Sequence, residues 1–399
     1  MLLGERQARY KAIEDYRKRP LIVYATATRA NLEVNMAADA VREFIYQIDA
    51  IPHESRAIDV LIHSTGGDPL AAWKLMSLLR ERFEKVGVLV PFMAFSAATL
   101  FALGADEIVM HPHASLGPID PQIQMMQADG SVRRFAYEDV GAFLRFLVNE
   151  VKITEQAHTS AVIEKLFSVV DPVNVGAAKR ASELSSSIGE RLLLTHMTGE
   201  DKTKARQIAE NLNKSFFAHG DAVSRKRARE LHLKIAKEDA ALEKLIWEAY
   251  LGLESYMELR EPFIPLQKYL ADPAGAAALR PPAPLNVPSN TPAQIAQQVW
   301  NQVLQQAAQN AANAGVEVPY SVVMAVIEST RVASEFKTLG RLTAMRAANG
   351  EIRIAGVDTD TKWKQVAVEA ATQQAHLAPA AGVQPAGPQP VVVPGGPQV

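Results

Sequence analysis

A serine in a turn of small residues, and a pair of glycines that precedes it by thirty residues, have the types and spacing that could do chemistry. Gly66 and Gly67 follow an apolar run in "LIHSTGGDP", and Ser96 follows the next apolar run in "VPFMAFSAAT". An acyl-transfer site needs a nucleophile on a sharp turn and backbone N–H groups aimed at the developing oxyanion. Glycine leaves such N–H groups unobstructed. We therefore expect a serine nucleophile and its oxyanion donors to be neighbours.

The elements that would position these turns alternate between strand and helix. Apolar runs rich in β-branched residues predict buried strands, and apolar residues at helical spacing predict helices between them. The predicted strands cover residues 21–28, 57–63, 86–95 and 106–112, and the predicted helices cover 36–51, 70–83 and 96–103. This alternation predicts an α/β fold with a parallel sheet covered by helices on both faces. Turns that follow neighbouring parallel strands lie at the same edge of the sheet.

Ser96 itself lies in an uncharged run from Gly87 to Ala105 that is nearly long enough to cross a membrane. A spanning helix needs about 20 mostly apolar residues. Pro91 and the glycines at 87 and 104 disfavour one continuous helix. We therefore expect a strand, a turn and a buried helix here, and no spanning helix, although association with a membrane stays open. A serine that begins a helix is also a common N-cap, which is the structural alternative to a nucleophile.

The chain divides into five predicted parts. Residues 1–19 form an amphipathic lead-in helix, and residues 20–260 form the α/β domain, whose part from 137 to 259 is mainly helical. A Pro- and Ala-rich linker or arm covers 261–290, and a helical C-terminal region covers 291–376. Within that region we expect helices over 293–315 and 321–348 that offer a surface for a partner. The Pro-, Gly- and Gln-rich tail, 377–399, is expected to be disordered.

The composition excludes several classes of function. The chain has 399 residues, 48% of them hydrophobic, and a formal net charge of -2, which argues against a general nucleic-acid binder. It has no cysteine, so it has no disulfide, thiolate metal site or cysteine nucleophile, and it suits a reducing cytoplasm. Charges within the first five residues predict no secretory signal. His111 and His113 flank a proline and have no third ligand nearby, and no P-loop is present, so we expect no metal or other cofactor.

Three stretches together resemble a known family. They are "LIHSTGGDPLAAWKLMSLL", "VPFMAFSAATLFALGADEIVMHPHASLGPIDPQI" and "FFAHGDAVSRKRARELHL". They are similar to the serine dehydrogenase proteinase family, a distant relative of Clp-type peptidases and signal peptide peptidase A with the Clp/crotonase fold. The resemblance covers residues 20–240 and implies that Ser96 is the nucleophile. It also implies that the amides of Gly66 and Gly67 form the oxyanion hole.

The resemblance leaves the general base open. The family has its catalytic residues in the order Ser, Asp, His, which points to Asp120 in "GPIDPQ" and His219 in "AHGD". Asp171 also fits that order. Signal peptide peptidase A instead pairs serine with lysine, which points to Lys165 or to Lys214. A lysine acts as a base when burial depresses its pKa.

The family implies a serine peptidase-like hydrolase that cleaves an unfolded peptide or a membrane-protein fragment, and that assembles as a homo-oligomer. Two alternatives remain. One is a non-catalytic scaffold that keeps the fold and binds partners through its C-terminal helices. The other is a crotonase-type acyl-CoA enzyme, which shares the fold and the oxyanion hole but has no need of a serine where Ser96 lies.

Overall fold

Four parallel strands form the part of the sheet that carries the candidate site. In the computed structural model they are β1 (Leu21–Thr26), β4 (Ala57–His63), β5 (Lys85–Val90) and β7 (Glu107–Met110), which lie side by side in that order. The structure describes residues 1–126, 130–214, 222–280, 291–314, 316–346 and 351–368. The α/β class with a parallel sheet, expected from the alternating pattern, is confirmed.

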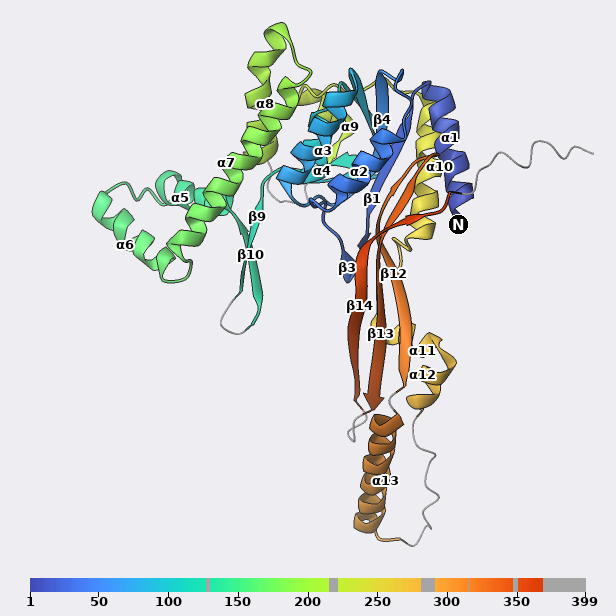
Figure 1. Cartoon of the computed structure of the whole chain (residues 1–399). Coiled ribbons are helices and arrows are strands. Elements are labelled where there is room, and N and C mark those ends of the chain that lie inside the picture. Colours follow the sequence, from blue (N-terminus) through green and yellow to red (C-terminus); the bar gives the residue numbers. More distant parts are fainter. Residues whose placement is uncertain (127–129, 215–221, 281–290, 315, 347–350, 369–399) are drawn as a thin grey trace, which may run out of the picture. The chain divides into compact units, whose positions relative to one another are not determined.

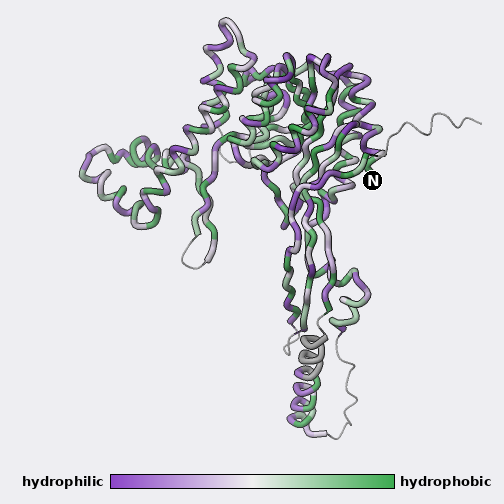
Figure 2. Tube along the Cα trace, viewed as in Figure 1, coloured by the Kyte–Doolittle hydropathy of each residue, from purple (hydrophilic) through white to green (hydrophobic). Residues whose placement is uncertain are grey.

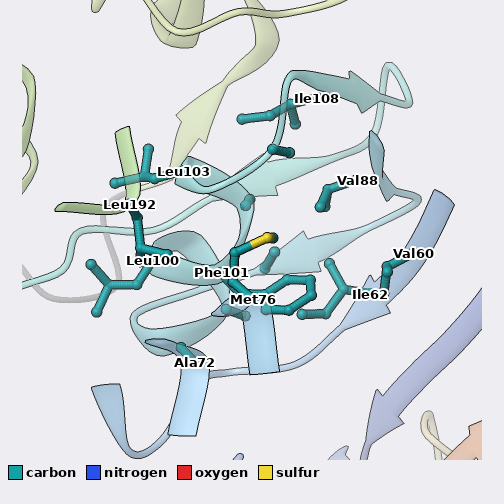
Figure 3. Close-up of a cluster of buried hydrophobic side chains, with 14 of the residues drawn as sticks. Val60, Ile62, Ala72, Met76, Val88, Leu100, Phe101, Leu103, Ile108 and Leu192 are labelled. Atoms are coloured by element: carbon teal, nitrogen blue, oxygen red, sulfur yellow. The ribbon is translucent and has the colours of Figure 1, made fainter. Parts of the chain in front are cut away.

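Helices cover both faces of these strands, as Figure 1 shows. On one face lie α2 (Ala40–Asp49), α3 (Pro69–Arg82) and α4 (Ala97–Leu103), which share a buried apolar cluster with the strands. On the other face α1 (Leu3–Arg17) and α10 (Ala240–Tyr256) form a second cluster. Figure 3 shows how side chains of the first cluster from β4, α3 and α4 meet. Because both faces are covered, most residues of these strands are apolar, and Figure 2 shows green segments among them.

The uncharged run around Ser96 is part of this core. It forms β5, the short strand β6 (Met93–Ala94) and the buried helix α4. Among the described residues no helix is long and apolar enough to cross a membrane. The expected strand, turn and helix are confirmed.

The prediction that residues 291–376 are helical is correct only for α13 (Ala293–Ala314). The second expected helix, over 321–348, is wrong. The chain instead forms long antiparallel strands, β12 (Glu317–Glu328), β13 (Ala333–Arg346) and β14 (Ile352–Val366). Alanine, methionine and leucine in this segment favour a helix locally, but pairing of β12 with β1 and burial of alternate residues decide the outcome. The expected disordered tail lies outside the described residues.

The segment expected to be a linker or arm also contains helices. α11 (Pro265–Ala271) and α12 (Pro273–Ala278) lie in the described part of 261–290, and Tyr269 is fully buried in a small apolar cluster with strand residues. Both helices begin with proline in the first turn, where its missing N–H costs nothing. Prolines that indicated an irregular segment therefore mark helix starts.

The remaining described elements include the expected mainly helical stretch after residue 137. They are β2 (Thr28–Arg29), β3 (Leu32–Glu33), β8 (Ser115–Leu116), β9 (Gln122–Met126), β10 (Val132–Ala136), α5 (Tyr137–Asn149), α6 (Gln156–Phe167), α7 (Pro172–Leu194), α8 (Lys202–Lys214), β11 (Val223–Ser224) and α9 (Arg225–Glu230).

A buried ion pair joins the first helix to the end of β12. The Arg6 guanidinium pairs with the Glu328 carboxylate, and both side chains are almost completely buried. The Tyr10 hydroxyl donates to the same carboxylate at 2.8 Å. The guanidinium also lies over the Tyr256 ring of α10, 3.6 Å from its centroid. One carboxylate therefore ties elements from both ends of the chain together.

Removing one partner of this pair should destabilise the fold strongly. Arg6→Ala leaves the Glu328 carboxylate buried without a counter-charge, which costs about 3–5 kcal/mol of unfolding free energy. Urea unfolding monitored by circular dichroism measures the loss. Asp15→Ala, which breaks the exposed Lys11–Asp15 pair on the same helix, is the control and should cost less than about 1 kcal/mol. Equal effects of the two variants would contradict this assignment.

Candidate active site

The two turns singled out in the sequence are joined by backbone hydrogen bonds. Beyond β4 and β5 the Phe95 N–H donates to the Ser64 carbonyl at 3.0 Å, and the Ser64 N–H donates to the Met93 carbonyl at 3.2 Å. The parallel pairing of the two strands thus continues to the residue before Ser96. The expectation that the glycine turn and the serine turn are neighbours is confirmed.

Gly66 packs directly against the serine turn. A Cβ atom at this position would lie 2.5 Å from the Phe95 carbonyl oxygen and 2.7 Å from the Ser96 Cβ. It would also lie 2.9 Å from the Ala97 nitrogen. The backbone of Gly66 has φ +108°, which L-residues rarely adopt. Only glycine therefore allows this approach.

Ser96 has a strained backbone and an uncommitted hydroxyl. Its φ of 49° and ψ of -117° lie outside the regions that non-glycine residues favour. It occupies the N-cap position of α4, yet its side chain makes no capping hydrogen bond. Within the described part of the chain its hydroxyl has no hydrogen-bond partner, and the residue is half-buried. The N-cap alternative therefore does not explain the serine.

One of the two expected oxyanion donors already has a hydrogen-bond partner. The Gly66 N–H donates to the Ser64 hydroxyl at 3.0 Å, and this hydroxyl also accepts from Thr26 Oγ1 at 2.9 Å. An N–H that already has a partner inside the turn is a poor donor to a substrate. The Gly67 N–H makes no hydrogen bond to any described residue. Ala97 is the first residue of α4, where a helix leaves its N–H groups without intrahelical acceptors.

A cleft of about 520 Å³ opens at these turns. It is lined by Glu33, Asn35, Thr65, Gly67, Pro69, Phe95, Ser96, Leu100, Ile119, Pro121, Gln122, Gln124 and Ser185. The lining combines apolar side chains with neutral hydrogen-bonding groups, and Glu33 is its one charged side chain among the described residues. Thr65 Oγ1 is buried there without a hydrogen-bond partner in the described structure. The cleft suits an uncharged polar chain with an apolar side group.

The candidate bases and acids that the structure describes are not among the residues lining this cleft. Asp120 is half-buried between two residues that do line it. Asp171 is the N-cap of α7, where its carboxylate accepts from the Val173 N–H at 2.7 Å. Lys165 is exposed on α6. Lys214 is exposed at the end of α8, where it lines a different cavity.

His219 lies outside the described residues. In the described part the structure therefore brings together the serine, the glycines and Ala97, and it does not add a base to them. Ala97 and the Thr26–Ser64 pair were missed in the sequence. Ala97 could have been proposed as an N–H donor because it directly follows the serine. Nothing in the sequence marks the Ser64 hydroxyl as a hydrogen-bond acceptor, apart from its position before the glycines.

A buried histidine supports the glycine turn from the strand side. His63, the last residue of β4, is fully buried, and its Nε2 lies 3.0 Å from Thr28 Oγ1. Its ring packs 5.0 Å from the Tyr250 ring, centroid to centroid. Burial lowers the pKa of His63 from 6.5 to about 3. The imidazole is therefore neutral in the folded protein near neutral pH.

Comparison with known families places the central part of the chain. Residues 35–144, which include both turns and the cleft-lining residues from Asn35 to Gln124, match the family model described as ClpP-like SDH-type serine proteinase. For this segment, the match agrees with the resemblance expected from the sequence motifs.

The curated relatives are two uncharacterized proteins of Methanocaldococcus jannaschii. MJ0137 is 30% identical over 193 residues, which is 48% of this chain and 58% of that protein. MJ1495 is 28% identical over 182 residues, which is 46% of this chain and 53% of that protein. The chain thus spans little more than half the length of these relatives.

Solved structures with a similar arrangement have low identity. Two are mutants of the 1510-N membrane-bound stomatin-specific protease, at 15% identity. One has a TM-score of 0.35 and covers 57% of this chain and 84% of its own. The other, in complex with a substrate peptide, has a TM-score of 0.34 and covers 56% and 77%. ClpP1 from Listeria monocytogenes is 13% identical, with a TM-score of 0.31, and covers 58% and 97%.

The strain at Ser96 should be measurable as a gain in stability when it is removed. Ser96→Gly should raise the unfolding free energy by about 1 kcal/mol, because glycine adopts this backbone without strain. Ser115→Gly is the control. Ser115 has no positive φ, so the change should lower stability by about 0.5–1 kcal/mol. A destabilised Ser96→Gly variant in urea unfolding would show that the backbone is not strained.

The buried His63 should make the fold sensitive to mild acid. The unfolded chain binds a proton below about pH 6.5 and the folded chain does not, so stability falls as the pH drops from 6.5 towards 3. His63 should contribute about 2 kcal/mol of the loss between pH 7 and pH 5. His63→Phe should remove this contribution in urea unfolding at both pH values, whereas the exposed control His53→Asn should leave it in place. An unchanged slope in His63→Phe would contradict the prediction.

Proposed function

Because residues 35–144 match the family model of the ClpP-like SDH-type serine proteinases, we propose that the protein is a serine peptidase-like hydrolase with Ser96 as its nucleophile. The observation that carries the proposal is the state of this residue. It is held in a strained backbone at the edge of the cleft, and its hydroxyl is not used for capping. Strain that the surrounding fold maintains at a reactive group is characteristic of functional sites.

The proposed reaction begins with attack of Ser96 Oγ on a peptide carbonyl carbon. The tetrahedral intermediate places negative charge on the carbonyl oxygen, and the N–H groups of Gly67 and Ala97 are the proposed donors to it. Gly66 supports them by allowing the close approach of the two turns. Collapse of the intermediate breaks the C–N bond, the leaving amine takes up the proton that the base removed from Ser96, and water then hydrolyses the acyl-serine that remains.

We propose His219 as the group that takes the Ser96 proton and Asp120 as its acidic partner. The alternatives are less suited to the task. A lysine base needs a desolvated environment, and both Lys165 and Lys214 are exposed. Asp171 is already engaged as a helix cap. Asp120 is half-buried in the segment that forms one wall of the cleft.

The proposed substrate is an unfolded peptide or protein segment. Gln122 and Gln124 of β9 line the cleft, so one strand runs along the place where an extended chain would lie. Phe95, Leu100 and Ile119 offer an apolar wall for one side chain. The absence of cysteine suits a cytoplasmic location, and a homo-oligomer is the proposed assembly. A scaffold without activity would need neither the strained serine nor the free hydroxyl, and a crotonase-type enzyme would need no serine nucleophile.

Labelling with a fluorophosphonate probe tests the nucleophile. The probe reacts with an activated serine, so the wild type should be labelled and Ser96→Ala should lose at least about 100-fold of the labelling rate. Ser185→Ala is the matched control. Ser185 lines the same cleft but its hydroxyl donates to the Ile119 carbonyl at 2.5 Å, so labelling should persist. Equal labelling of the wild type and Ser96→Ala would rule out the proposal.

A further inference from the structure

The last described strand leaves one long edge of the sheet open. β14 (Ile352–Val366) has 15 residues and pairs with β13 on one side. Its other side makes no backbone hydrogen bond to any described residue. Figure 1 shows β14 beside β13, on the side away from β12. Residues 355–359 are exposed on both faces. An open edge of this length is a template for pairing with another strand.

The charges on β14 change sign about a single residue. Asp358 and Asp360 precede Thr361, and Lys362 and Lys364 follow it at the same spacing. Lys362 and Lys364 both reach the Asp360 carboxylate within the chain, at 3.2 and 2.8 Å. All three side chains are partly or fully exposed, so these contacts contribute little to stability and are free to exchange.

We propose that β14 pairs antiparallel with β14 of a second copy of the chain, about a two-fold axis at Thr361. In this register Asp360 lies opposite the second copy's Lys362, and the reverse pair forms on the other side of the axis. Opposite charges directly across two strands stabilise their pairing, and like charges destabilise it. An interface between two identical surfaces must be self-complementary, which this sign change provides.

Neighbouring registers do not have this complementarity. An axis at residue 360 places Asp360 opposite Asp360 of the second copy. An axis at residue 362 places Lys362 opposite Lys362 of the second copy. An axis at 359 opposes the two aspartates, and an axis at 363 opposes the two lysines. Among these five registers only the axis at Thr361 avoids like-charge pairs.

Charged residues and bulges on an edge strand also serve to prevent pairing. β14 has a bulge, because Leu339 pairs with Asp360 and Gly340 pairs with Asp358, which leaves Thr359 extra. The bulge lies outside the segment from Asp360 to Lys362, so the pairs nearest the axis form on regular backbone. Charges that serve only to block pairing would repel those of a second copy in every register. The charges of Asp360 and Lys362 instead attract those of the second copy when the axis lies at Thr361.

A single cysteine tests the axis directly, because the chain has no cysteine of its own. Residue 361 would face its own copy, and paired strand residues have Cα separations of about 4.5–5.5 Å, which suit a disulfide. Thr361→Cys should therefore form a covalent dimer on mild oxidation, seen on non-reducing gels. Val357→Cys is the matched control, since residue 357 would face residue 365 of the second copy, and it should give at least 10-fold less dimer.

Charge exchange tests the pairs. Asp360→Lys and Lys362→Asp should each weaken self-association at least 10-fold in sedimentation velocity, and the double variant should restore it. Arg341→Glu reverses an exposed charge on β13 and should leave association unchanged. Thermal melts check that each variant is folded, and the double variant tests the pairing even where a single variant unfolds.

Three results would overturn the proposal. They are a wild type that stays monomeric at about 100 µM with no Thr361→Cys dimer, equal cross-linking at 357 and 361, and a double variant that does not recover association. If the chain also assembles through another surface, the Asp360→Lys variant should still form a smaller assembly than the wild type. An assembly mass that Asp360→Lys leaves unchanged would also overturn the proposal. None of these results depends on Ser96, so they leave the proposed hydrolase activity to its own test.

Discussion

The contact between Gly66 and the Phe95–Ser96 turn is the constraint on which the candidate site depends. Two neighbouring parallel strands end in these turns, and the space between them is smaller than a methyl group. Any side chain at residue 66 would push the serine turn away from the glycine turn, and with it the Ala97 N–H from the Gly67 N–H. The Ser64 hydroxyl holds the glycine turn from inside by accepting from the Gly66 N–H. The reactive geometry is therefore a property of the sheet edge and not of Ser96 alone.

The fold supplies the free energy that keeps Ser96 in a strained conformation. Every residue of α4 is buried, and β5 is buried from its second residue onwards. A helix and a strand anchored on both sides leave the connecting residue little freedom to relax. Thr99 adds to this, because its hydroxyl oxygen lies 2.7 and 2.8 Å from the Ala94 and Gly117 carbonyl oxygens and accepts from the Gly117 N–H at 3.0 Å, which fixes the turn to the following loop. The packing that stabilises the core is thus the same packing that holds Ser96 in its strained conformation.

The sequence predicted this region well because its signals are local. Apolar runs, a glycine pair and small residues around one serine each constrain their own backbone, and parallel strands then bring the two turns together. The C-terminal part was mispredicted because its outcome is not local. Residues 321–348 have side chains that suit a helix, and pairing with β1, some 300 residues earlier in the chain, decides in favour of strands. The hydrogen bond from the Gly66 N–H to the Ser64 hydroxyl was not predicted either, because no motif marks that hydroxyl.

The C-terminal strands change what the parallel sheet exposes. Without them β1 would be an edge strand at the side of the sheet away from β7, and β12 covers it with an antiparallel pairing from Val23 to Thr26. The buried Arg6–Glu328 pair fixes this addition, because Glu328 ends β12 and Arg6 belongs to the helix that covers the same strands.

Adding strands to the side of an open sheet does not remove the open edge but moves it outwards. Here the open edge is that of β14, at the side of the sheet opposite β7. The charges on β14 complement those on β14 of a second copy of the chain. The edge at which copies of the chain can meet is therefore separated from the turns at the ends of β4 and β5 by β13, β12 and β1.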